Sequence, residues 1–179
     1  MIQTAPRMLS AQEALEIPDC ICPTLVLTDN LTSWVSREIK AHTHGHYSHA
    51  MWLWYPEALA TQGWRFTVEW LGLYLKGQHR VKFWYNPDWS AILKERMQER
   101  LKTDVLNAKK YDWLGIMGQL LGVRGLNFSK RNYCSEEAGM VLHIGESMFR
   151  MKHPSPADLD VWCKAAPQME VYGIFDPTL

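Results

Sequence analysis

Two short segments, about eighty-five residues apart, hold the residues most suited to covalent chemistry. His49 follows Tyr47 and Ser48 and opens an apolar run that predicts a strand over residues 50–55. Cys134 precedes a predicted helix over residues 135–144. A helix N-terminus and a nearby imidazolium both lower the pKa of a thiol, and the thiolate is the reactive form. The sequence therefore predicts a Cys-His pair in which the histidine comes first along the chain.

A Cys-His pair needs a third group that orients the imidazole. Glu69 is a carboxylate within the otherwise apolar segment 65–71, and strand alternation puts it on the same face as Thr67. If this strand pairs antiparallel with residues 50–55, Glu69 can lie beside His49. The alternative is that Glu69 faces solvent from an edge strand.

These residues resemble the motifs of a hydrolase family. The segments that match are Tyr47-Ser48-His49-Ala50, Thr67-Val68-Glu69-Trp70, Lys110-Tyr111-Asp112-Trp113 and Tyr133-Cys134-Ser135-Glu136. Together they resemble the circularly permuted papain-fold hydrolases of the YiiX type, which are permuted relatives of the NlpC-type cell-wall peptidases. In the unpermuted relatives the cysteine helix comes first, whereas here it comes last.

The resemblance implies roles for the matching residues. It makes Cys134 the nucleophile, His49 the base and Glu69 the orienting group, and it implies hydrolysis of an amide, peptide or ester bond through a thioester without a cofactor. Tyr111, Tyr47 and Ser135 are the candidates for contacts with substrate or oxyanion, beside the backbone N–H of Cys134. The expected substrate is a small molecule, a peptide or an acyl compound.

Two other functions remain open for the same residues. His42, His44 and His46 alternate, so an extended backbone would point all three imidazoles the same way, as in a zinc or nickel site. The chain is alternatively a catalytically silent or metal-binding interaction module with a papain-like shape. Such a module would present an aromatic surface drawn from Trp52, Trp54, Trp64, Trp70 and Trp84.

Hydrophobic period and turn residues predict the elements that carry these side chains. Strands are expected over 24–28, 50–55, 65–71 and 80–85, the last three as an antiparallel meander. Helices are expected over 11–16, over 33–41 with Asp29 or Asn30 as N-cap, from 91 to about 110 as a solvated amphipathic face, and after Pro156 up to Cys163. A second helical or turn segment is expected over 111–121.

The charge and hydrophobicity of the sequence limit the classes of partner that we expect. The 19 basic residues balance 19 acidic residues, so no electrostatic footprint for nucleic acid is expected. No apolar run reaches membrane-spanning length, and no signal peptide pattern begins the sequence, so we expect a cytoplasmic protein, with phage or viral association suggested by the tryptophan and methionine content. Among the cysteines, Cys20, Cys22 and Cys163 are expected to be buried packing residues.

The expected fold is α+β. A small antiparallel sheet packs against the helix that carries the cysteine, in a permuted papain-like (NlpC-like) arrangement. Residues 1–179 are expected to form a single domain with its core at about 24–144 and a C-terminal tail, 146–179, that the resemblance does not assign. The oligomeric state does not follow from the sequence.

Overall fold

The computed structural model describes residues 6–55, 58–62, 66–107, 134–151 and 154–179. In these residues six strands form one antiparallel sheet with the order β4-β3-β2-β1-β5-β6. The strands are β1 (Thr24–Asn30), β2 (His49–Tyr55), β3 (Ala58–Gln62), β4 (Phe66–Trp70), β5 (His79–Tyr85) and β6 (Glu170–Phe175). The β4 strand forms one edge of the sheet and β6 the other.

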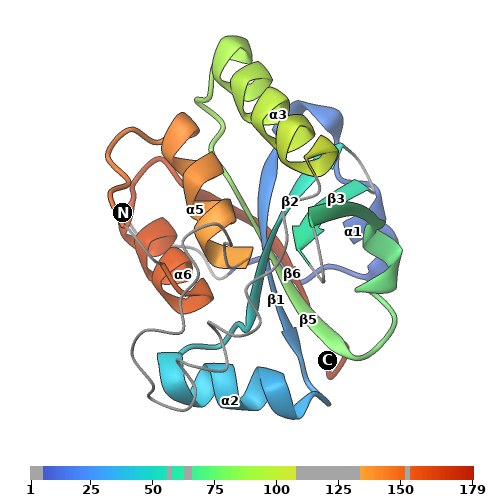
Figure 1. Ribbon diagram of the computed structural model, residues 1–179. Coiled ribbons are helices and arrows are strands. Elements are labelled where there is room, and N and C mark those ends of the chain that lie inside the picture. The colour runs from blue at the N-terminus through green and yellow to red at the C-terminus, as the bar shows by residue number, and fades with distance from the viewer. Residues whose placement is uncertain (1–5, 56–57, 63–65, 108–133, 152–153) are drawn as a thin grey trace.

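The central strand is β1, and its sequence explains its position. Its first six residues are all buried, and consecutive side chains enter different cores: Leu25 and Leu27 belong to one apolar cluster and Val26 to the other. A strand that is covered on both faces has no polar face and reads as a continuous apolar run. The sheet is therefore the middle of three layers (Figure 1).

Helices cover both faces of the sheet. One face packs against α3 (Ala91–Leu106), α5 (Cys134–Gly145) and α6 (Pro156–Ala165), whose apolar residues join Leu25, Leu27 and Trp52 in the first cluster. The other face packs against α1 (Ala11–Leu15) and the short 3-10 turn η2 (Leu71–Leu73). The remaining elements are η1 (Asp19–Ile21) and α2 (Trp34–Thr43), and α2 lies near α6 at one end of the sheet (Figure 1).

Serine side chains begin four of these helices. Ser10, Ser33, Ser90 and Ser155 each accept a hydrogen bond from a backbone N–H in the first turn of α1, α2, α3 and α6. The prediction of Asp29 or Asn30 as the cap of α2 is therefore wrong. Asn30 instead accepts hydrogen bonds from the N–H groups of Thr32 and Ser33 and makes the turn that leads to the true cap.

The predicted meander is only partly right, because an additional strand was not expected. β3 lies between β2 and β4 and pairs with both, so the strand that carries Glu69 is not adjacent to the strand that carries His49. The strand predicted at 80–85 leaves the meander and pairs with β1. The segment 58–62 is short and contains two alanines and a polar end, which explains why its pattern did not indicate a strand.

The C-terminal tail completes the sheet. α6 follows the expected Pro-rich lead and packs on the first cluster, while β6 pairs antiparallel with β5 from Val81↔Phe175 to Tyr85↔Glu170. The tail therefore contributes both a covering helix and an edge strand to the same α+β fold. In the described parts of the chain, no helix has the length and apolar character needed to cross a membrane. The segment predicted as helix or turn over 111–121 lies outside the described residues.

Candidate functional site

Cys134 is the first residue of α5 and is buried. The first N–H groups of a helix have no partner within the helix, and the helix dipole adds partial positive charge there. The position therefore favours a thiolate at Cys134 and places backbone donors next to it. α5 is held against the sheet because Trp52 of β2 donates its indole N–H to the carbonyl of Ala138, at 3.2 Å.

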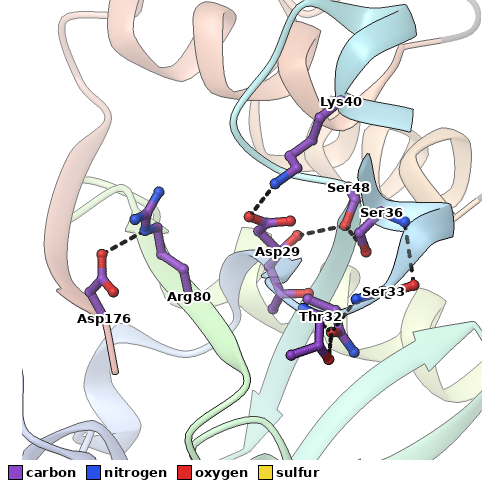
Figure 2. A network of polar contacts seen from close by, with 10 residues as sticks. Asp29, Thr32, Ser33, Ser36, Lys40, Ser48, Arg80 and Asp176 are labelled. Atoms are coloured by element: carbon purple, nitrogen blue, oxygen red, sulfur yellow. Dashed lines mark hydrogen bonds and ion pairs between the residues drawn. The ribbon is translucent and has the colours of Figure 1, made fainter. Parts of the chain in front are cut away.

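His49 is the first residue of β2 and pairs with Thr28 of β1. The residue before it is fixed twice: the N–H of Ser48 donates to the carbonyl of Thr28 at 2.9 Å, and its hydroxyl donates to Ser36 of α2 at 2.8 Å. Figure 2 shows this polar network, in which Lys40 of α2 also bonds to the buried Asp29 of β1 at 2.6 Å. His49 therefore lies at the start of a strand that is hydrogen-bonded both to β1 and to α2 through Ser48.

The structure brings His49 and Cys134 together, and their side chains are hydrogen-bonded. Burial alone lowers the pKa of His49, but the charge of the Cys134 thiolate, the hydrogen bond to it and the charge of Glu69 outweigh burial and raise the pKa. The interaction is mutual, so the same contact that favours the imidazolium also favours the thiolate. An acid-base pair of this kind can form a Cys⁻/His⁺ ion pair.

Glu69 lies farther along the sheet than the sequence suggested, on the edge strand β4. It pairs with Leu59 of β3, which in turn pairs with Leu53 of β2. Because paired residues of neighbouring strands point to the same face of a sheet, these three side chains share one face. Its side chain is half-buried, and Oε2 accepts a hydrogen bond of 2.7 Å from the hydroxyl of Tyr74. The charge of Glu69 is among the causes that raise the pKa of His49. Because β3 separates the two strands, the expected antiparallel pairing of the Glu69 strand with residues 50–55 is wrong, and the role of Glu69 as the orienting group stays a prediction.

The acidic residues after Cys134 are buried rather than exposed in the first turn. Glu137 has no exposed side chain, and its Oε1 accepts a hydrogen bond of 2.8 Å from Arg100 of α3. Arg100 also donates to the buried Asp104 at 2.6 Å. The prediction that the helix from residue 91 is a solvated charged face is wrong at this point, because these side chains lock α3 onto the cysteine helix.

The other sequence candidates fall in different places. Tyr47 is buried in the first cluster, and the Nζ of Lys82 lies 5.9 Å from the centre of its ring. Burial and the charge of Asp160 raise the pKa of Tyr47, so this hydroxyl keeps its proton as a donor. Ser135 is buried as the second residue of α5. Tyr111, and the segment 110–113 around it, lie outside the described residues.

The three alternating histidines do not adopt the extended backbone that the metal hypothesis requires. His42 lies in the last turn of α2, and His44 caps this helix with a left-handed φ of 52°. His46 lies in the following loop and is exposed. Among the residues that the structure describes, no group of three or more His, Cys, Asp or Glu side chains is placed to hold a metal ion.

The remaining cysteines differ from one another. Cys22 and Cys163 are buried as expected, and burial raises the pKa of Cys22 to about 12 and that of Cys163 further. Cys20 is exposed, so its assignment as a packing residue is wrong. The sheet core likewise holds Trp52 and Trp84, which therefore cannot form the aromatic surface considered for an interaction module.

The sequence did not indicate that Tyr74, His79 and Asp29 interact with one another. Tyr74 follows η2, and its ring centre lies 5.2 Å from that of His79. Burial lowers the pKa of His79; the charge of Asp29 opposes this effect and the charge of His49 adds to it. Asp29 was read as a helix cap. Only the register of β5 on β1, with Asn30↔His79 beside Thr28↔Val81, could have placed them here.

Comparison with protein families finds no match to this sequence, and comparison with curated proteins finds none either.

Proposed function

We propose that this chain is a thiol hydrolase that cleaves an amide, peptide or ester bond. The observation that carries the proposal is the hydrogen bond between Cys134, at the N-terminus of α5, and His49, at the start of β2. The proposed fold is the permuted papain-like arrangement, since a histidine strand precedes a cysteine helix and that helix packs on the sheet. Glu69 supports the pair through its charge.

The proposed reaction has two steps. The Cys134 thiolate attacks the carbonyl carbon, and the oxyanion that forms accepts a hydrogen bond from the backbone N–H of Cys134. The His49 imidazolium then gives its proton to the leaving amine or alcohol, which leaves a thioester on Cys134. In the second step His49 takes a proton from water, whose oxygen attacks the thioester and releases the acid and the thiolate. Atoms and charge balance without a cofactor.

Selective alkylation tests the thiolate directly. At pH 6 an ordinary thiol is only about 0.3% thiolate, so iodoacetamide reacts with it slowly. We expect Cys134 to be labelled first at pH 6 in the whole protein, as located by peptide mass spectrometry. Three internal controls are present: Cys20 is an exposed thiol, whereas Cys22 and Cys163 are buried.

Two variants complete the test. His49→Ala is expected to slow labelling of Cys134 at pH 6 by about 10- to 100-fold, because the imidazolium no longer favours the thiolate. Cys134→Ala should keep the circular dichroism spectrum and melting curve of the folded protein and lose any amidase or esterase turnover. Labelling of Cys20 as fast as Cys134 at pH 6, or full turnover by Cys134→Ala, would contradict the proposal.

A second candidate function, an interaction module, is favoured by a different observation. Val68 and Trp70 of the edge strand β4 are 41% and 45% exposed, and Leu73 beyond them is 50% exposed. An exposed apolar edge of this kind is a common feature of protein interaction sites. The same alkylation experiment separates the two functions, because an interaction module does not require a reactive thiolate at Cys134.

A further inference from the structure

The connection from β4 to β5 crosses one face of the sheet. It starts at Trp70, which pairs with Ala58 at one edge strand, and ends at His79, which pairs with Asn30 of the central strand. Because β3, β2 and β1 lie between these positions in the strand order, the connection must span all three. Leu71 and Leu75 anchor it in the second apolar cluster.

Tyr74 lies in the middle of this crossing and contacts groups on both sides. Its hydroxyl donates to Oε2 of Glu69 at 2.7 Å. Its ring packs on His79, with 5.2 Å between the ring centres and 58° between the planes. Both of these partners are electrostatically coupled to His49, Glu69 through its carboxylate and His79 through its imidazole.

The edge position of Glu69 explains why a hydrogen bond from Tyr74 matters for the direction of its carboxylate. A half-buried carboxylate on an edge strand can turn toward water, where its charge is screened, and fixing a glutamate side chain costs conformational entropy. A hydrogen bond to a charged oxygen is stronger than a neutral one and fixes direction as well as distance. The rigid two-rotor side chain of tyrosine, packed by its ring, is a suitable donor.

We propose that Tyr74 is a positioning residue that, packed on His79, fixes the direction of the Glu69 carboxylate by its hydrogen bond and so holds this charge toward His49. Its meaning for catalysis rests on the proposed hydrolase function. The positioning itself does not, because it concerns only the hydrogen bond from Tyr74 to Glu69 and the effect of the Glu69 charge on His49. Within the described residues, the titratable groups whose charges are coupled to that of His49 are Cys134 of α5, Glu69 of β4 and His79 of β5.

The test is a double-variant cycle read by NMR titration of the His49 imidazole in the full chain. Glu69→Gln removes the charge and is expected to lower the pKa of His49 by about 0.5 to 1.5 units, the range for a charge that acts across a partly buried separation. Tyr74→Phe keeps the ring on His79 and removes only the hydroxyl, and it should lower the pKa by at least half as much. The double variant should match Glu69→Gln alone.

A matched control is available on the same sheet. Tyr85 of β5 donates its hydroxyl to Oε2 of Glu170 at 2.8 Å, so Tyr85→Phe removes an equivalent hydrogen bond at the opposite end of this strand. It should leave the titration of His49 unchanged. Should Tyr74→Phe not fold, Tyr74→Met removes the hydroxyl while retaining a long apolar side chain.

The outcomes separate this inference from the hydrolase proposal. An unchanged His49 titration in Tyr74→Phe, or shifts that add in the double variant, would overturn the positioning role. Repeating the cycle in a Cys134→Ala background should give the same Tyr74 effect, because neither Tyr74 nor Glu69 acts through the thiol. Failure of selective alkylation at Cys134 would end the hydrolase proposal and leave this result standing.

Discussion

The buried ion pair between Lys82 of β5 and Asp160 of α6 offers a quantitative test of the packing of α6 on the sheet. The Nζ of Lys82 lies 2.8 Å from Oδ1 of Asp160, and both side chains are about 95% buried. Oδ1 also accepts the indole N–H of Trp84 at 3.0 Å, and Oδ2 bonds to Lys164 at 2.6 Å. Asp160 therefore has three partners. Among the described residues, Lys82 forms its ion pair with Asp160.

The perturbation is Asp160→Ala, which leaves the Lys82 ammonium buried without its carboxylate. Breaking a buried pair by removing one partner costs about 3–5 kcal/mol. The cost also has an upper limit, because Lys82 can instead lose its proton. Taking a lysine with an ordinary pKa of about 10.4 to its neutral form costs about 5 kcal/mol at pH 7 and about 2 kcal/mol at pH 9.

The sign of the pH dependence follows from this limit. In Asp160→Ala the folded pKa of Lys82 is depressed, so the unfolded chain binds more protons and the stability of the variant rises with pH. In the wild type, burial alone raises the pKa of Asp160, but hydrogen bonds from Lys164, Lys82 and Trp84 and the charge of Lys82 lower it overall. The wild-type contribution of Asp160 is therefore present above the ordinary aspartate pKa and is lost only in more acidic solution.

The assay is guanidinium unfolding at pH 7 and pH 9, followed by tryptophan fluorescence. The deficit of Asp160→Ala relative to wild type should be about 3–5 kcal/mol at pH 7 and should fall to about 2 kcal/mol at pH 9. Lys82→Met should cost less, because Asp160 keeps Trp84 and Lys164, and the double variant should show no such pH dependence. A deficit that stays the same at both pH values would refute an unpaired Lys82 charge as its source.

Two further predictions concern the helices on the same face. Arg100→Met removes the hydrogen bond to Glu137 that ties α3 to the cysteine helix and the bond to Asp104 within α3. It should cost about 3–5 kcal/mol in guanidinium unfolding, more than Glu137→Gln, which leaves the bond to Asp104. Equal losses in the two variants would contradict the bridging role of Arg100. Ser155→Ala removes the N-cap of α6 and should cost about 1 kcal/mol, whereas Ser155→Asp should retain most of the stability. A neutral Ser155→Ala would show that the cap does not limit stability.

Local patterns in the sequence predicted most of the elements. The continuous apolar run after Pro23 indicated a strand and became the central strand β1, and the Lys76-Gly77 turn before β5 contains a glycine with a φ of 78°. The helical period after Ser90 predicted α3, which ends at Leu106. The α+β class is confirmed, while the permuted papain arrangement and the roles of the three site residues stay predictions.

The strand order of the sheet and the contacts among the site residues could not be predicted from local sequence patterns. The sequence alone selected His49 and Cys134, because a histidine at a strand start and a cysteine at a helix start are local features with a known chemical use. Their contact, and the separation of the Glu69 strand from the His49 strand by β3, are properties of the assembled fold. Strand order and register are set by burial summed over the whole sheet, so no single segment carries them. For the same reason, the contacts of Tyr74 with Glu69 and His79 could not be predicted without the connection that crosses the sheet from β4 to β5.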